Sequence, residues 1–182
     1  MVVESEPFVI LVADRDATVG VISSMLLSSA LAIEHESFFA RVRVLVEPEI
    51  ISVIEKPELP EEVRKIEEQV MSATRADIEH ANLVVAFSGL DVRKLHELRE
   101  RGIPAPAVNL CQFVANLEKL IHNLASARVN VRDVIVNAAL QFGFGGGSST
   151  CEICAMQERE SFNYWINIAD TCSKFAQIVR KL

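Results

Sequence analysis

Residues 8–33 read FVILVADRDATVGVISSMLLSSALAI, and this stretch decides the fold. The apolar run at 8–13 has the length of a buried strand, and residues 17–33 have the length of a helix. A strand followed directly by a helix is the first half of a β-α unit. The small serines of the helix are expected to allow close packing on a sheet. We expect its buried face to contain Ile22, Met25, Leu26, Ser29 and Ile33.

The same alternation continues to the end of the chain. Strands alternating with helices indicate a mainly parallel sheet with helices on both faces. We therefore expect one α/β domain over residues 1–182, doubly wound and flavodoxin-like or Rossmann-like, with five strands in the order 2-1-3-4-5 and a long C-terminal helix. Further strands are predicted at 40–46, 82–88, 106–110 and 131–140, and further helices within 56–81, 91–104, 111–126 and about 150–181.

Some elements carry position-specific signals. Residues 40–46 alternate, with valines on one side and Arg41 and Arg43 on the other, which is typical of an edge strand. Gly102 is expected to end its helix in the left-handed conformation. The apolar stripe of the C-terminal helix is predicted at Trp165, Ile168, Ala169, Cys172, Phe175, Ala176 and Val179.

The composition excludes several classes of protein. The 182-residue chain is half hydrophobic and 24% charged, as expected for a globular domain. Its net charge of −7 argues against a nucleic-acid-binding face, which needs clustered basic residues. The longest uncharged stretch, 17–33, is marginal in length for a membrane span, and Glu4 and Glu6 stand where a secretory signal needs positive charge. We expect a cytoplasmic protein that binds neither nucleic acid nor membranes.

Polar residues follow several of the predicted strands. Asp14 and Asp16 follow the first strand, Ser88 the third, and Asn109 and Cys111 the fourth. In doubly wound sheets, ligands bind beyond the carboxyl ends of the strands, near the point where the strand order reverses. These residues are therefore expected to line one edge of the sheet and to bind a small polar or anionic metabolite.

The turn VILVADRDATVG at 9–20 is similar to the first motif of haloacid-dehalogenase-like phosphatases, Asp-x-Asp-x-Thr after an apolar strand. This resemblance implies that Asp14 is a nucleophile and Asp16 an acid/base beside Mg²⁺, and Ser88 resembles part of that family's second motif. The family's later lysine followed by a strand-end acidic pair is not found. The turn also resembles the first strand of receiver domains, which hold magnesium with paired acids, although Ser88 stands where a receiver has its acceptor aspartate.

Asp14 or Asp16 can instead cap the helix that follows and complement its dipole. Two carboxylates at this turn would also repel phosphate, which many α/β proteins bind at the first β-α turn. A phosphate site, if the protein has one, is therefore expected elsewhere on the sheet edge.

The segment QFGFGGGSSTCEIC, residues 141–154, holds four of the seven glycines of the chain. As the last β-α turn it would offer backbone amides and a helix start, with capping-box spacing from Ser149 to Glu152. This makes it the preferred anion site, with a mobile lid or linker as the alternative. The anion would be bound by Gly143, Gly145, Gly146, Gly147, Ser148, Ser149 and Thr150.

Two of the four cysteines form a C-x-x-C pair at this predicted helix start. Cys151 lies where the positive end of the helix favours a thiolate, as in thiol redox motifs. With Cys154 and Cys111 it could instead hold zinc or an iron–sulfur cluster, or all these thiols could be inert. Cys172 is about 27 Å from Cys154 along a continuous helix, which makes it a core residue.

Three functions are compatible with these patterns. The first is a small-molecule-binding protein, with Asp14, Asp16 and Cys151 as catalytic candidates if it is an enzyme. The second is a phosphatase-like enzyme that uses the two aspartates and Mg²⁺. The third is a non-enzymatic protein, either a thiol metal-binding protein or a homo-oligomeric subunit that associates through its apolar excess, including Phe38, Phe39 and the terminal helix.

Overall fold

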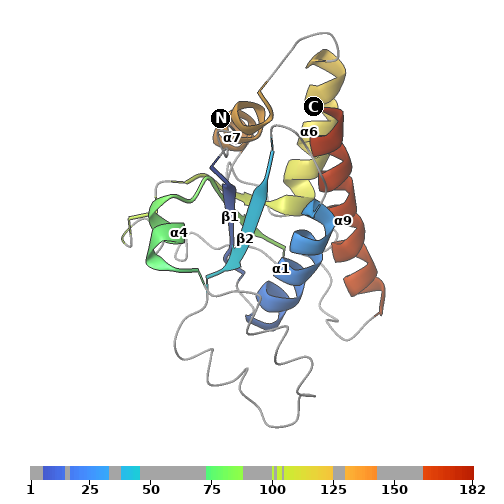
Figure 1. Cartoon of the computed structure of the whole chain (residues 1–182). Coiled ribbons are helices and arrows are strands. Elements are labelled where there is room, and N and C mark those ends of the chain that lie inside the picture. Colours follow the sequence, from blue (N-terminus) through green and yellow to red (C-terminus); the bar gives the residue numbers. More distant parts are fainter. Residues whose placement is uncertain are drawn as a thin grey trace.

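The computed structural model describes residues 6–14, 17–32, 38–45, 73–87, 100, 102–103, 105–124, 130–142 and 162–182. Within these residues, four strands form one all-parallel sheet in the order β2-β1-β3-β4 (Figure 1). This order agrees with the prediction for the first four strands, and β2 lies at the edge as expected. The strands are β1 (Phe8–Val12), β2 (Ala40–Val44), β3 (Leu83–Ala86) and β4 (Ala107–Asn109).

The strands that follow β1 in the chain lie on both sides of it in the sheet. The chain passes from β1 to β2 on one side and then to β3 on the other, so Ile10 pairs with Val42 and with Leu83. The point where the strand order reverses therefore lies between β1 and β3. The carboxyl ends of these two strands are the place where an α/β sheet of this order is expected to bind a ligand.

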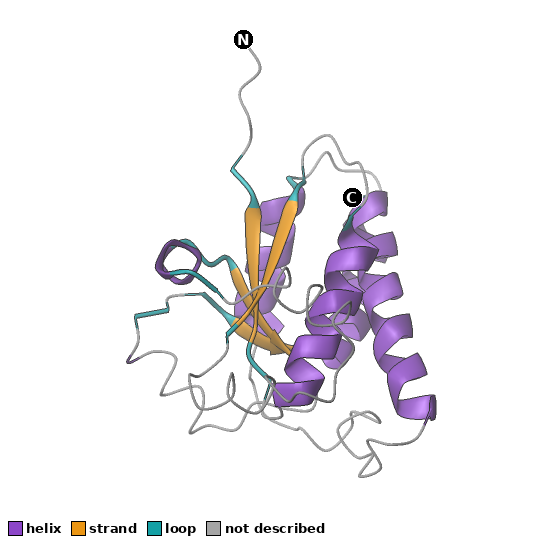
Figure 2. Ribbon diagram, turned by 60° about the horizontal axis from the view of Figure 1, so that its bottom comes forward, coloured by secondary structure: helices purple, strands orange, loops and turns teal. Residues whose placement is uncertain are grey.

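Helices cover both faces of the sheet, as expected for a doubly wound α/β fold. One face packs against α1 (Ala17–Leu31), α6 (Leu110–Leu124), α7 (Val131–Phe142) and α9 (Phe162–Lys181). The short α4 (Arg75–Glu79) packs on the other face, against a smaller apolar cluster (Figure 2). Strand residues alternate between the two clusters, so Ile10 and Val12 face the four helices, while Val9 and Leu11 face α4.

The predicted buried face of α1 is wrong. Ile22, Met25 and Leu26 are half-buried, Ser29 is exposed, and Ile33 lies outside the described residues. The buried residues of the helix include Leu27, Leu31, Ser23 and Ser24. This helix is apolar around most of its circumference, so its spacing alone could not select a face. Ser23 and Ser24 lie in the interior and donate their hydroxyls to the carbonyls of Val19 and Val21, and the expectation that serines allow close packing on the sheet stays a prediction.

The predicted strand at 131–140 is a helix, α7, so the five-stranded sheet is not what the structure shows. Asn130 caps this helix by accepting hydrogen bonds from the amides of Arg132 (3.0 Å) and Asp133 (3.5 Å). The β-branched residues suggested a strand, but the cap and the helical spacing of the apolar residues outweigh that preference. The buried residues are Val131, Ile135, Ala138 and Ala139.

The predicted helix at 56–81 is not continuous. Thr74 is extended and caps α4, and the Ala73 amide donates to the carbonyl of Val44 (2.9 Å). A helix through residues 73–74 is therefore excluded, and residues 56–72 lie outside the described part.

Other local predictions are confirmed. Gly102 has the predicted positive φ, +80°, whereas residues 91–99 of the helix that it was expected to end lie outside the described part. Of the predicted stripe of α9, Ile168, Cys172, Phe175, Ala176 and Val179 are buried, and Trp165 and Ala169 are half-buried. Residues 150–161, the predicted beginning of that helix, are not among those described. None of the helices in the described part combines the length and apolar character that crossing a bilayer requires.

Candidate functional site

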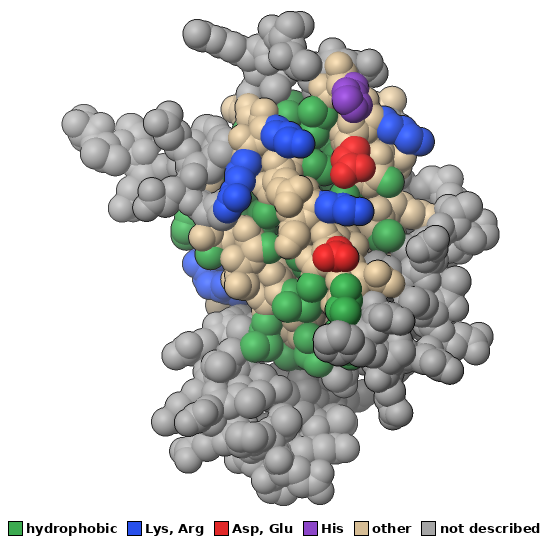
Figure 3. Space-filling model, turned by 90° about the vertical axis from the view of Figure 1, so that its right-hand side faces the viewer, with side chains coloured by type: hydrophobic (Ala, Val, Ile, Leu, Met, Phe, Trp, Pro, Cys, Tyr) green, Lys and Arg blue, Asp and Glu red, His purple; other side chains and the backbone are tan. Residues whose placement is uncertain are grey.

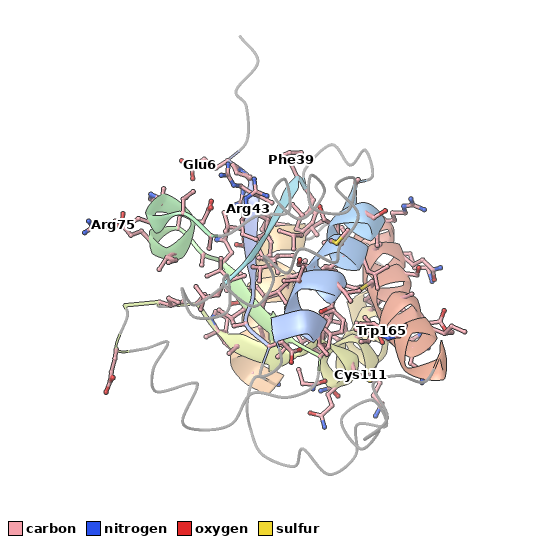
Figure 4. All side chains as sticks on the ribbon, turned by 90° about the horizontal axis from the view of Figure 1, so that it is seen from below. Glu6, Phe39, Arg43, Arg75, Cys111 and Trp165 are labelled. Carbon is pink, nitrogen blue, oxygen red and sulfur yellow. The ribbon has the colours of Figure 1, made fainter. Side chains whose placement is uncertain are left out.

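The candidate site is the edge of the sheet at which β1, β3 and β4 end. Figure 4 views the molecule from the side on which α1, α6 and α9 begin, and it shows Cys111 of α6 and Trp165 of α9 on this side. Both side chains are half-buried and pack against the larger core cluster. The sequence did not indicate that Trp165 would lie near the predicted site residues, because the position of this side chain depends on the direction in which α9 runs.

Asp14 lies directly beyond β1 and is half-buried. Its Oδ2 accepts a hydrogen bond from the backbone amide of Phe87, the residue after β3, at 2.8 Å. The neighbouring Ala13 amide donates to the carbonyl of Val85 (2.9 Å), so the β1–β3 pairing leads directly to Asp14. We call this pair, the Asp14 carboxylate and the Phe87 amide, the β1–β3 junction.

Helix α1 approaches this junction closely. A Cβ atom placed on Gly20, in the first turns of α1, would lie 3.4 Å from the Cβ of Asp14. The backbone of α1 at Gly20 therefore lies beside Asp14. The bond to Phe87 was not predicted from the sequence, which suggested only a helix cap or a metal ligand for Asp14. No local signal reports the register of β1 against β3, so sequence reasoning could not find this partner.

Asn109 ends β4 on the other side of β3, opposite Ala86. Its Oδ1 accepts a hydrogen bond from the amide of Gln112 (3.4 Å), so it caps the first turn of α6. Cys111 lies in that same turn. The structure thus brings Asp14, Asn109 and Cys111 to one edge of the sheet, with the end of β3 between the first two.

The remaining predicted site residues lie outside the described part: Asp16, Ser88, Gly143, Gly145, Gly146, Gly147, Ser148, Ser149, Thr150, Cys151 and Cys154. The Gly-rich segment follows the helix α7 and not a fifth strand, so the argument that it forms the last β-α turn no longer holds. Among the residues that are described, no group of three or more His, Cys, Asp or Glu side chains could hold a metal ion.

Cys172 is a core residue, as predicted. Its side chain is 1% exposed in α9, and burial raises the pKa of its thiol to about 12. A buried neutral thiol in this position serves packing and is not suited to redox or metal chemistry.

A cluster on the opposite face was not predicted. Arg41 and Arg43, on the outward face of β2, both point to the carboxylate of Asp77 in α4. The predicted alternation of β2 placed the two arginines correctly, but their partner depends on how α4 packs. The spacing of Thr74 and Asp77, which form a capping box, is a sequence signal that could have located the start of α4.

The surface over α6 and α9 mixes charges of both signs with apolar and polar side chains (Figure 3). Among the described residues of these two helices, the exposed Asp, Glu, Lys and Arg side chains are Glu118 and Lys119 on α6 and Asp170, Lys174, Arg180 and Lys181 on α9. Such alternation is typical of a solvated helix face. Phe38, expected at an oligomer interface, is buried against Phe8 with ring centroids 5.1 Å apart, whereas Phe39 is 65% exposed.

Comparison of the chain with protein-family models, with curated proteins and with solved structures finds no match to any of them.

Proposed function

We propose that this protein binds a small polar metabolite at the β1–β3 junction. The observation that carries the proposal is the hydrogen bond between the Asp14 carboxylate and the Phe87 amide (2.8 Å). It places an ionisable side chain at the carboxyl ends of two neighbouring parallel strands, where the strand order reverses. Ligands of α/β sheets bind preferentially at this position.

The surroundings of Asp14 support a binding role. Asp14 is half-buried, at the boundary between the core and the surface. The hydrogen bond from the Phe87 amide limits the positions that the carboxylate can adopt. A group oriented in this way loses little conformational entropy when it binds a ligand. Asn109 and Cys111 would contribute to the same site from the end of β4.

The experiment is a binding screen on the full chain with mixtures of common polar metabolites. Binding is followed by the backbone amide signals of Phe87 and Asn109 in ¹H–¹⁵N correlation spectra. We expect a bound metabolite to shift these signals and Asp14→Asn to weaken its binding by about tenfold or more, because a hydrogen bond to a charged group is lost.

The matched control is Asp133→Asn, which removes the same charge from the first turn of α7. Arg132, the preceding residue, bonds to the carbonyls of Glu6 and Pro7 before β1, so this control lies toward the opposite edge of the sheet. Binding that Asp14→Asn and Asp133→Asn weaken equally would contradict a site at the junction.

The same contact also favours, as a second candidate, the phosphatase-like enzyme with Asp14 and Asp16 beside Mg²⁺. The bond joins Asp14 to Phe87, the residue before Ser88, which the resemblance assigns to the second motif of that family. Unchanged phosphatase activity in Asp14→Asn would exclude this alternative.

Other expectations stay proposals: a cytoplasmic location, self-association of the chain, a complete flavodoxin-like arrangement, and participation of the segment 143–151 with Cys151 and Cys154. Light scattering tests self-association, since a monomer at all concentrations would contradict it. Metal analysis and a visible spectrum of anaerobically prepared protein test zinc or an iron–sulfur cluster at the cysteines.

A further inference from the structure

Asp14 places a negative charge at the β1–β3 junction. It also accepts the hydrogen bond of the Phe87 amide, so that this donor is already in use. The Phe87 amide, which an anionic ligand could use at the end of β3, already donates to Asp14 Oδ2 at 2.8 Å. Backbone amides at strand ends and helix starts are the usual donors to phosphate and carboxylate groups in α/β proteins. An anion arriving at this position would therefore have to displace Asp14 from the amide.

The beginning of α1 has a similar relation to Asp14. The first turns of a helix carry partial positive charge and favour a nearby anion. Asp14 lies close to these turns: a Cβ atom placed on Gly20 would be 3.4 Å from the Cβ of Asp14. The carboxylate of the chain itself thus stands where the helix and the strand end would otherwise attract an external anion.

We infer that Asp14 determines the charge specificity of the site, so that the β1–β3 junction accepts a ligand group that is cationic or donates hydrogen bonds, such as an ammonium, an amide N–H or a hydroxyl. This inference rests on the proposed function. A phosphate or carboxylate is rejected unless a metal ion offsets the charge of Asp14, which is the situation in the phosphatase-like alternative.

The size of the discrimination follows from the charges. A ligand charge within hydrogen-bonding reach of the half-buried Asp14 is attracted if positive and repelled if negative. At the effective dielectric constants of protein surfaces, this difference corresponds to a preference of about tenfold or more for the cation. Replacing Asp14 with Asn retains an oxygen acceptor for the Phe87 amide but removes the charge, so the preference should disappear while the local geometry is kept.

The test uses three four-carbon probes that differ only in their end groups: 1,4-diaminobutane, 1,4-butanediol and succinate. Each is titrated into the full chain, into Asp14→Asn and into Asp133→Asn, and the amide signals of Phe87 and Gly20 are followed. In the wild-type chain we expect the diamine to shift these signals at about a tenth of the concentration that succinate needs, or less, with the diol between them. Asp14→Asn should reduce that ratio to about one, and Asp133→Asn should leave it unchanged.

The possible failures are distinguishable. Succinate that shifts the Phe87 signal as readily as the diamine in the wild-type chain overturns the charge specificity but leaves a binding site at the junction. A diamine preference that survives in Asp14→Asn also overturns it, because the preference then comes from the overall negative charge. If neither these probes nor the metabolite mixtures shift the signal in any variant, the proposed function itself is wrong.

Discussion

Among the described residues, Asp77 is the one charged residue that is buried, with an exposed fraction of 4%. Its Oδ2 accepts hydrogen bonds from the amide (2.8 Å) and the hydroxyl (2.9 Å) of Thr74. Arg41 Nε lies 2.9 Å from Oδ1 without an aligned hydrogen bond, and Arg43 Nε lies 3.9 Å from Oδ2. The arginines therefore act mainly through their charge, and Asp77 joins β2 to α4 by both hydrogen bonding and electrostatic attraction.

Several opposing effects act on the pKa of Asp77. Burial is the largest and by itself raises the pKa, but the hydrogen bonds from Thr74 and the positive charges of Arg41 and Arg43 together outweigh it. The net result is a pKa below the ordinary value of 3.8. Because the folded state holds the ionised form more strongly than the unfolded chain, ionised Asp77 stabilises the fold.

We predict that this stabilisation depends on pH. It should be complete above the unfolded pKa of 3.8 and should be lost as the pH falls through the lowered pKa of the folded state. Asp77→Asn removes the charge but keeps the shape, so wild type and variant should converge in free energy of unfolding on acidification. Urea unfolding between about pH 6 and pH 2 measures this difference.

Glu79→Gln is the matched control, because Glu79 is an exposed acid of the same helix that pairs only with the exposed Arg75 among described residues. It should change the free energy of unfolding by less than about 0.5 kcal/mol at any pH. A constant difference between wild type and Asp77→Asn down to the lowest pH would contradict a lowered pKa for Asp77.

At the scale of the element, α1 shows how small polar side chains decide packing. It contacts α9, β1 and β2, and the buried Ser23 and Ser24 bond to carbonyls of their own helix. Hydroxyls satisfied in this way can be buried without an outside partner. The serines leave space that a leucine would fill, so they set how closely α1 approaches its neighbours.

We predict that Ser23→Leu destabilises the protein by about 1 to 3 kcal/mol, because added methyl groups overpack a close contact. The control is Ser28→Leu, the same exchange at an exposed position of α1, which should cost less than about 0.5 kcal/mol. Urea unfolding at neutral pH gives both values. Equal stability of the two variants would contradict the buried position of Ser23 in α1.

At the scale of the whole molecule, α9 holds the helical layer together. It lies between α1 and α6 and contacts both, and its Phe175 packs on Phe113 of α6 with ring centroids 6.4 Å apart. Cys172 lies on the buried face of this helix, one turn before Phe175. A reagent can reach that thiol only when the layer opens, so its reactivity reports the opening of the core.

We predict that the rate of alkylation of Cys172 is lower in the native protein than in the unfolded chain by about a thousandfold or more. Exposure of this thiol requires unfolding, and the buried thiol, with a pKa of about 12, is protonated near neutral pH. Peptide mapping by mass spectrometry follows labelling at this residue with and without urea. Rapid labelling in the absence of urea would contradict the core position.

Much of the fold could be predicted from local patterns. The strands β1 to β4, the left-handed Gly102 and the buried stripe of α9 each depend on properties of neighbouring residues. Patterns were insufficient where two preferences competed. In α7 the β-branched residues favoured a strand, while Asn130 and the spacing of Val131, Ile135, Ala138 and Ala139 favoured the helix. In α1 the lack of a polar face removed the signal altogether.

The sequence by itself determined the four strands, the edge position of β2 and the presence of Asp14 and Asn109 at strand ends, because these follow from spacing along the chain. Only the tertiary structure decided that Asp14 bonds to Phe87 and that Asp77 pairs with Arg41 and Arg43. The physical reason is that these contacts join residues far apart in sequence. Asp14 and Phe87 are 73 residues apart, and their meeting depends on strand register, which residues near either of them do not encode.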